Sequence, residues 1–453
     1  MNTHSKHGKT DRTEFDSGQP SDGPSRRQVL AMIGAGAGTG LAGCSGDGGS
    51  EVTETDTPTA TATRTETESA GGLARNENEA DEFEYAFDGE SQFDSFVETD
   101  DATFVVDGAP IYFNGTNNYT LVDPDSSHAG TIDTRLQLYE ELGVSVVRTW
   151  AFCEGQGGRC YQPNAGEYNE AAFEHLDYLI AKAGQHGIRL VLSFTDYWDH
   201  YGGMPKYAEW AGLEKTSEFY TSEAAQQLYR DYVEYVLTRE NTFTGREYRT
   251  EPAILAWELA NEPRCKGISD NVSVFQTWVE ETSAFIKGID DNHLLSTGME
   301  GFNNRPGGSS WRSNGSEGTD FVENHSVEDI DICSAHLYPQ AWNISVDEAN
   351  SYLERRARLA EEEIGKPFYL GEFQWSIDGR QNDDSIESEK RNEALSGWYD
   401  ILDRHDADAA MIWQLRHEDV TDNGGFAVWP SDETMDIIDD YTQKQKEKSE
   451  ATS

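Results

Sequence analysis

The 453-residue chain carries 84 acidic and 35 basic side chains, which gives a formal net charge of −49 at pH 7. A surface this negative repels the phosphates of nucleic acids, so nucleic-acid binding is excluded as a function. Hydrophobic residues make up 36% and aromatic residues 11% of the chain. This composition allows one large core beneath a very polar surface, on which most acidic side chains serve hydration.

The first 44 residues have the pattern of an export signal. The paired arginines Arg26 and Arg27 precede a run of small and apolar residues, 31–42, that is too short to span a bilayer. The run ends in the tetrapeptide LAGC at 41–44, which resembles a lipobox. The sequence therefore predicts a twin-arginine, lipoprotein-type signal over 1–44. We expect an exported, extracellular protein whose only membrane attachment is a lipid on Cys44.

Residues 45–82 are rich in Ser, Thr, Glu, Asp and Gly. Such a segment cannot bury enough apolar surface to become ordered, so we predict a disordered, acidic and Thr-rich linker. In the rest of the chain the acids are scattered along the predicted helices. This distribution resembles that of proteins from halophilic archaea, whose acidic surfaces are screened in concentrated salt. We therefore expect the stability of the protein to increase with salt.

From residue 83 onwards, apolar strands alternate with helices, which is typical of an α/β fold. A hairpin with an Asp107-Gly108 turn leads into the first strand, near 111–115. Seven further strands are predicted, at 144–148, 188–194, 253–256, 293–297, 330–336, 367–373 and 409–413. Helices are predicted near 131–142, 170–186, 221–239, 273–289, 346–364, 386–403 and 433–446. The pattern predicts one (β/α)8 TIM barrel over 83–447.

Two of the predicted strands end in glutamates. Glu262 follows the fourth strand, in the stretch WELANEP at 257–263, and Glu372 ends the seventh strand. Barrel enzymes carry their catalytic groups at the carboxyl ends of the strands. Hydrolysis of a glycosidic bond with retention of configuration needs two carboxyl groups, one protonated and one ionised. The two strand-end glutamates therefore indicate a retaining glycosidase.

Five motifs, in order, resemble glycoside hydrolase family 5, and within it the endo-β-1,4-mannanases of the plant and fungal type. They are RTWAF at 148–152, WDHYGG at 198–203, WELANEPRC at 257–265, HLYP at 336–339 and GEF at 371–373. The resemblance covers roughly residues 95–430. It implies hydrolysis of internal β-1,4 linkages in mannan, glucomannan or galactomannan, without a metal or another cofactor.

The resemblance also implies a role for individual residues. Glu262 would be the general acid/base and Glu372 the nucleophile. Asn261 would hold the 2-hydroxyl of the reacting sugar. Arg148 would hydrogen-bond the nucleophile and keep it ionised, and Tyr338 would donate its hydroxyl to the same carboxylate.

The remaining predicted site residues would contact the sugar. His336 would lie beside the acid/base, and Trp413 would form a platform under the reacting sugar. Trp198 and Tyr201 are expected in the binding cleft. After the nucleophile and Phe373, the chain continues with Gln374 where many relatives have glycine, which leaves the subsite preference open.

Two other functions remain compatible with these patterns. An endo-β-1,4-glucanase of the same family would differ only in its tolerance of the axial 2-hydroxyl of mannose. A surface lipoprotein that binds polysaccharide without cutting it is the second alternative, and the intact Glu262 and Glu372 pair argues against it. We expect a monomer.

Four cysteines follow Cys44, and they allow three pairings. Cys153 and Cys160 flank a Gly-rich loop and are candidates for a disulfide outside the cell. The other two are Cys265 and Cys333. The spacings of these four cysteines do not suit a zinc site.

Overall fold

The computed structural model describes residues 85–122, 129–156, 160–305, 307–377, 386–420 and 425–452. The signal predicted over 1–44 and the linker predicted over 45–82 lie outside these residues. Within them, no helix is long and apolar enough to cross a membrane.

Eight parallel strands form a closed ring. They are β4 (Phe113–Asn117), β5 (Val146–Trp150), β6 (Arg189–Ser193), β7 (Ile254–Glu258), β8 (Leu294–Ser296), β9 (Cys333–Leu337), β10 (Phe368–Phe373) and β11 (Ala409–Ile412). The hydrogen-bonded order is β8-β7-β6-β5-β4-β11-β10-β9, and a parallel bridge between Ser296 and Ile332 joins the two ends. The structure thus confirms the predicted (β/α)8 barrel.

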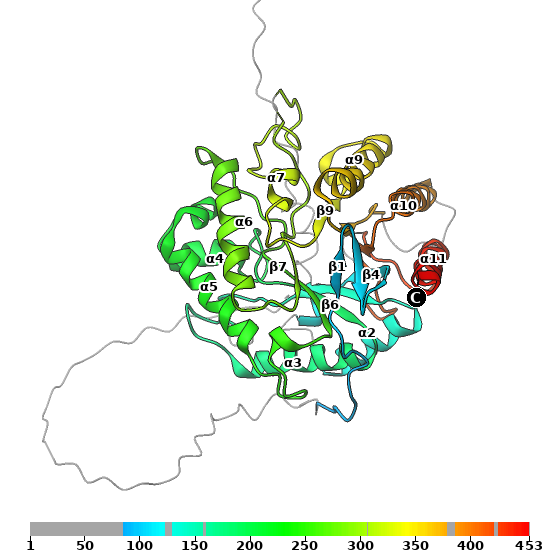
Figure 1. The fold of residues 1–453 in the computed structure, drawn as a ribbon, viewed down its shortest axis with the longest axis horizontal. Helices are drawn as coiled ribbons and strands as arrows, with labels where there is room; N and C mark the ends of the chain where they lie inside the picture. The colour runs from blue at the N-terminus through cyan, green and yellow to red at the C-terminus, as the bar shows by residue number, and fades with distance from the viewer. Residues whose placement is uncertain are drawn as a thin grey trace, which may run out of the picture.

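Helices surround the ring of strands, as Figure 1 shows. They are α2 (Ala129–Glu141), α3 (Glu170–Gln185), α5 (Glu223–Thr238), α6 (Asn271–Lys287), α7 (Phe321–His325), α9 (Val346–Leu359), α10 (Ile386–Arg404) and α11 (Thr434–Thr452). Two shorter helices, α4 (Gly203–Trp210) and α8 (Pro339–Trp342), follow β6 and β9. The sequence prediction missed α4, α7 and α8, and it ended α11 too early.

Local sequence explains where the helices begin and which face they bury. Asn169 accepts a hydrogen bond from the backbone N–H of Ala171 and so caps α3, and Phe173, Leu176 and Leu179 follow at helical spacing and are fully buried. The main apolar core lies between such helix faces and the outside of the barrel.

A small antiparallel sheet covers the amino-terminal end of the barrel. It consists of β1 (Glu98–Asp100), β2 (Thr103–Val106) and β3 (Ala109–Pro110). Asp107 and Gly108 both have positive φ, 52° and 79°, as the predicted tight turn requires. Phe104 of β2 packs against Phe113 of β4 within a second apolar cluster, which fills the barrel. The opposite end of the barrel therefore remains available for a functional site.

Candidate active site

The two predicted acids meet at the carboxyl end of the strands. Glu372 lies within β10, and Glu262 lies just beyond the end of β7. Both side chains are buried, with 1% and 0% of their surface exposed. Glu262 has a φ of 48°, in the left-handed region that residues other than glycine rarely adopt. Such backbone strain is concentrated at functional sites, where the surrounding structure imposes it.

The segment that follows β8 holds Glu262 in this conformation. The backbone N–H of Glu262 donates to the carbonyl oxygen of Gly298, 2.9 Å away. Gly298 itself has a φ of 68°, and a Cβ there would lie 2.0 Å from the carbonyl oxygen of Ala260. Only glycine therefore allows the two segments to approach this closely.

The distance between the carboxyl groups defines the chemistry that they can support. One carboxylate oxygen of Glu262, one of Glu372 and a ring nitrogen of His336 all lie within 4.8 Å of one another. Retaining glycosidases hold their two carboxyl groups about 5–5.5 Å apart, whereas inverting enzymes separate them by about 6.5–9.5 Å to admit a water molecule. The observed spacing fits the retaining geometry that the sequence predicted.

Glu372 is surrounded by strong hydrogen-bond donors. Arg148 Nη1 donates to Glu372 Oε1 at 2.8 Å, and the Tyr338 hydroxyl donates to Oε2 at 2.6 Å. Charge-assisted bonds of this kind are about twice as strong as neutral ones. The structure thus confirms both predicted contacts of this carboxylate.

A buried carboxylate on β7 fixes the position of Arg148. Glu258 accepts bonds from Arg148 Nε and Nη2, the second at 2.7 Å, and it also accepts the Tyr369 hydroxyl at 2.6 Å. Burial opposes the charge of Glu258, but the guanidinium beside it lowers its pKa. The same carboxylates raise the pKa of Arg148, although its own burial acts in the other direction. Arg148 is therefore a permanently charged link between Glu258 and Glu372.

Glu262 has different neighbours. His336 Nδ1 lies 2.8 Å from Glu262 Oε1, and Trp198 Nε1 donates to Oε2 at 2.8 Å. His336 Nδ1 also lies 3.7 Å from Glu372 Oε2, so its ring is placed between the two acids. This geometry confirms the predicted position of His336 and places Trp198 directly at the site.

Asn261, the residue before Glu262, is held by two side chains. Its Oδ1 accepts from Arg148 Nη2 at 2.8 Å, and its Nδ2 donates to Asp196 Oδ1 at 3.0 Å. Burial raises the pKa of Asp196. These bonds fix the orientation of the amide, and the second hydrogen on Nδ2 can be offered to a sugar hydroxyl.

The predicted aromatic platform lies at the end of the strand that pairs with the Glu372 strand. Trp413 follows β11 and stacks on Tyr119, with ring centroids 5.7 Å apart and planes inclined by 13°. Trp150 lies 6.3 Å from Trp413, and Tyr201 lies 6.3 Å from Tyr119. Trp413 and Tyr201 therefore belong to one aromatic group at the carboxyl end of the barrel.

The donor set of Glu262, His336 and Glu372 also has the spacing of a metal site. However, Arg148 places a permanent positive charge 2.8 Å from Glu372. A divalent cation at the same carboxylate would experience strong repulsion from it in this buried setting. The groups present therefore suit two carboxyls acting on a substrate better than a bound metal ion.

Sequence reasoning missed several residues that support the site. Asn117 of β4 accepts from Arg148 Nη1 and donates to the carbonyl oxygens of Gly371 and Met411. Asp196 and Tyr369 were missed as well. Asp196 and Tyr369 lie in or next to a barrel strand that carries one of the five motifs, whereas the strand of Asn117 carries none. Polar residues in otherwise apolar strands were the available sequence signal.

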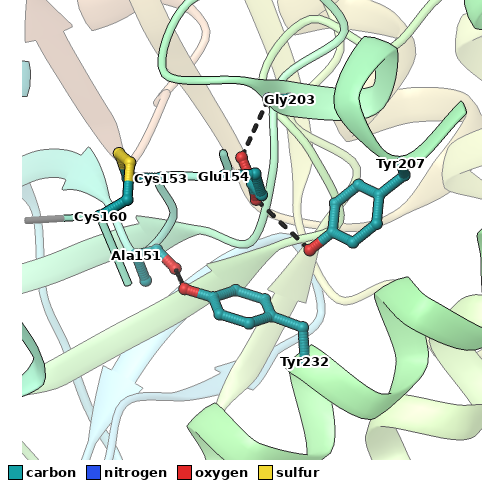
Figure 2. Close-up of a disulfide and its surroundings, with 7 residues drawn as sticks. All are labelled: Ala151, Cys153, Glu154, Cys160, Gly203, Tyr207 and Tyr232. Atoms are coloured by element: carbon teal, nitrogen blue, oxygen red, sulfur yellow. Dashed lines mark hydrogen bonds between the residues drawn. A yellow bond between two sulfur atoms is a disulfide. The ribbon is translucent and has the colours of Figure 1, made fainter. Parts of the chain in front are cut away.

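A disulfide lies beside the site. Cys153 and Cys160 are bonded, which is one of the pairings that the sequence left open, and Cys265 and Cys333 are buried free thiols. Figure 2 shows Glu154 next to this disulfide, with its carboxylate accepting the backbone N–H of Gly203 at 2.9 Å. Burial raises the pKa of Glu154 well above its ordinary value. Gly203 begins α4, so Glu154 connects the disulfide loop to the segment that carries Trp198.

A carboxyl pair at this spacing, at the carboxyl end of a (β/α)8 barrel, defines a glycoside hydrolase. Comparisons with known proteins define the family. Residues 94–414 match the model of the family described as GH family 5 beta-mannosidase-like. The chain belongs to this family.

Individual relatives agree with this assignment. Mannan endo-1,4-beta-mannosidase 1 of Arabidopsis thaliana is 36% identical over 347 residues, which cover 71% of this chain and 82% of that protein. Mannan endo-1,4-beta-mannosidase 1 of Oryza sativa subsp. japonica is 36% identical over 343 residues, covering 71% and 78%. The crystal structure of the endo-1,4-beta-mannanase from Rhizomucor miehei is 30% identical, with a TM-score of 0.72, covering 78% of this chain and all of that one.

Proposed function

We propose that the protein is a retaining endo-β-1,4-mannanase that cleaves internal linkages of mannan, glucomannan or galactomannan. The observation that carries the proposal is the pair of carboxyl groups, with oxygens within 4.8 Å, whose surroundings differ. The names of the relatives support mannan as the substrate.

The reaction takes two steps. Glu372 attacks the anomeric carbon and forms a glycosyl ester, while the bond from that carbon to the linking oxygen breaks and Glu262 transfers its proton to this oxygen. In the second step a water molecule attacks the same carbon, Glu262 takes the proton from the water, and the ester bond to Glu372 breaks. Both carboxyl groups then return to their starting states.

The neighbouring residues position and stabilise these groups. Arg148 and Tyr338 hold Glu372 in line for attack and stabilise its charge when it leaves the sugar. His336 and Trp198 orient Glu262 toward the leaving oxygen.

Two further groups bind the reacting sugar in this proposal. Asn261 offers its remaining amide hydrogen to the 2-hydroxyl. Trp413 packs against the C–H face of the ring, and Tyr201 borders the same cleft. The hydrolysis uses no metal, so activity should persist after exhaustive treatment with a chelator. A loss that added Zn²⁺ or Ca²⁺ restores would contradict this part of the mechanism.

The competing functions are separated by a product profile on two matched oligosaccharides. We expect mannohexaose to be cut internally, to mannobiose, mannotriose and mannotetraose, and cellohexaose to be cut much more slowly. Faster cleavage of cellohexaose would make the protein a β-1,4-glucanase. Binding of mannohexaose without any products would make it a polysaccharide-binding protein.

We also infer an extracellular, monomeric enzyme tethered to the membrane through Cys44. The paired arginines, the short apolar run 31–42 and the LAGC tetrapeptide support this proposal. Mass spectrometry of the protein purified from membranes of its source should find a mature N-terminus at a lipidated Cys44. An unprocessed N-terminus would contradict it.

The net charge of −49 supports adaptation to concentrated salt, as in halophilic archaea. Screening of the mutual repulsion between carboxylates should raise the melting temperature steadily between 0.1 M and 2 M KCl. A melting temperature that is independent of KCl would contradict this inference.

A further inference from the structure

Several arginines gather outside the active site described above. A cavity of about 380 Å³ lies between the loop that follows β8 and the first turns of α9. Arg305, Arg312, Arg355 and Arg356 line it, and we call it the arginine pocket. Its volume lies within the range of small-molecule binding sites, about 300–1,000 Å³.

The arginines of the described residues differ in their partners: some pair with carboxylates, whereas Arg189, for example, donates to backbone carbonyl oxygens. Arg148, Arg239 and Arg264 each contact two carboxylates. Within the described part of the chain, none of the four pocket arginines has a carboxylate oxygen within 4.0 Å. In a chain with a net charge of −49, an unneutralised group of cations is unexpected. Partly buried positive charges that lack counterions are costly, so an anion would stabilise this arrangement.

Two acids also border the cavity, against four arginines, and one of them, Glu348, attracts Arg312 electrostatically. Asp347 and Glu348 are both exposed, and Glu348 accepts hydrogen bonds from the backbone and hydroxyl of Ser345, which caps α9. Arg356 is 3% exposed, and its Nε donates to the carbonyl oxygen of Gly301. Arg305 repels it electrostatically, and Asp320 attracts it. The pocket therefore retains a local excess of positive charge.

Buried polar atoms indicate the chemistry of the missing ligand. Arg305 Nη2 and Arg355 Nε are buried donors without a hydrogen-bond partner among the described residues. Asn303 is only 5% exposed, and its acceptor Oδ1 likewise has no hydrogen-bond partner among the described residues. Buried polar groups normally have partners, so these three atoms indicate a ligand. The guanidinium donors suit a carboxylate, and the acceptor suits a hydroxyl group.

A chain of packed side chains links the pocket to the active site. Trp198 contacts Glu262, and the Arg264 guanidinium lies 5.0 Å from the Trp198 ring and 5.7 Å from the Trp311 ring. The Arg312 guanidinium lies 5.5 Å from the same Trp311 ring. The pocket is thus on the Glu262 side of the site, where a long substrate would continue beyond the bond that is cut.

We propose that the arginine pocket binds the carboxylate of an acidic sugar. The sugar is carried either as a side group of the polysaccharide substrate or as a free sugar acid. The first source rests on the proposed hydrolysis of mannan, whereas the second does not. In both cases the guanidinium groups bind the carboxylate and Asn303 accepts a neighbouring hydroxyl.

The first test compares two forms of one polysaccharide at a single fixed salt concentration. Galactomannan is oxidised at C6 of its galactosyl side groups to carboxylates, and kcat/KM is measured for the oxidised and the untreated polymer. The kcat/KM for the oxidised polymer, divided by that for the untreated polymer, should fall roughly tenfold in Arg355→Gln and in Arg312→Gln. A roughly tenfold fall is the effect of losing one charge-assisted hydrogen bond. The matched control is Arg358→Gln, on the same helix but outside the pocket and paired with Glu362, and it should leave the ratio unchanged.

The second test measures free ligands by calorimetry, with glucuronate as the acid and glucose as the neutral control. Binding of glucuronate alone, lost in Arg355→Gln and kept in Arg358→Gln, supports a site for free sugar acids. A kcat/KM ratio that falls in the pocket variants, without binding of free glucuronate, supports a side group of the polysaccharide as the source of the carboxylate. If neither measurement depends on Arg355 or Arg312, or if Arg358→Gln has the same effect, the proposal is overturned. Inactivity on both polymers would contradict the proposed function, and calorimetry would still test the pocket.

Discussion

Glu372 and Glu262 have oxygens within 4.8 Å of each other, yet their surroundings differ in charge. Glu372 accepts bonds from a guanidinium and a phenol, and the same guanidinium is held by Glu258. Glu262 instead contacts an imidazole and an indole. The contrast teaches that one barrel mouth can surround two carboxyls with different donors, as the proposed division into nucleophile and acid/base requires: a guanidinium hydrogen-bonds Glu372, whereas an imidazole and an indole contact Glu262.

The largest expected effect on activity concerns Glu372, the carboxylate that Arg148 hydrogen-bonds. Glu372→Gln keeps the size and the hydrogen-bond acceptor of the side chain but removes the nucleophile. We expect kcat on mannan to fall at least about 10⁴-fold, because the covalent route is lost. The variant should keep its melting temperature and its affinity for mannohexaose. Substantial remaining activity would assign the nucleophile to another residue.

Glu262→Gln should have a large effect that depends on the leaving group. General acid–base catalysis contributes about 10²–10⁴-fold, and we expect a loss of this size on mannan. In an aryl mannobioside with an acidic phenol, the leaving group departs as a phenolate and needs no proton. Formation of the glycosyl ester from this substrate should therefore be much less impaired. An equal loss on both substrates would contradict the role of Glu262 as the acid.

Removing the hydroxyl of Tyr338 tests the hydrogen-bond donors around Glu372. Tyr338→Phe removes a 2.6 Å bond to Glu372, and loss of a bond to a charged group should lower kcat/KM by roughly 10–100-fold. Tyr178→Phe provides a matched control, since the Tyr178 hydroxyl donates to Asp133 on the outside of the barrel. The control should remain fully active. Equal losses in the two variants would show a general effect on folding.

The smallest expected effect concerns Glu154, a buried carboxyl at the edge of the site with a raised pKa. An unfolded glutamate has a pKa of about 4.3. The stability that comes from the proton on native Glu154 is therefore fully present below that pH, and it is lost as pH rises through the higher native pKa. Glu154→Gln is neutral at every pH and keeps an oxygen acceptor for Gly203.

The melting temperature of Glu154→Gln should therefore improve relative to wild type between pH 5 and pH 8, by roughly 2 °C. The exposed Glu214, changed to Gln, should show no such trend. A pH-independent difference between wild type and Glu154→Gln would mean that Glu154 does not bind a proton more tightly in the native state.

Local sequence predicted the eight strands and the two acids, because each strand has a short apolar run and each acid ends one of them. The shared contacts of Arg148 were not predictable in full. Glu258 was not among the predicted site residues, and Asn117 and Tyr369 come from strands far apart in the sequence. Their meeting depends on the register of the closed sheet, which local patterns do not determine.

The arginine pocket had no sequence signal either. Arg305 and Arg312 come from the loop after β8, whereas Arg355 and Arg356 come from α9. In the sequence, these residues resemble the other scattered basic side chains. Only the packing of the loop against the helix brings the four guanidinium groups around one cavity.

The most direct test of the central claim is the configuration of the first product. Proton NMR during the first minutes of mannohexaose hydrolysis distinguishes the β-anomer from the α-anomer before mutarotation mixes them. A nucleophile and an acid/base with oxygens within 4.8 Å predict the β-anomer, because two displacements retain the configuration. Initial release of the α-anomer would show a single displacement by water and would contradict the mechanism proposed for Glu372 and Glu262.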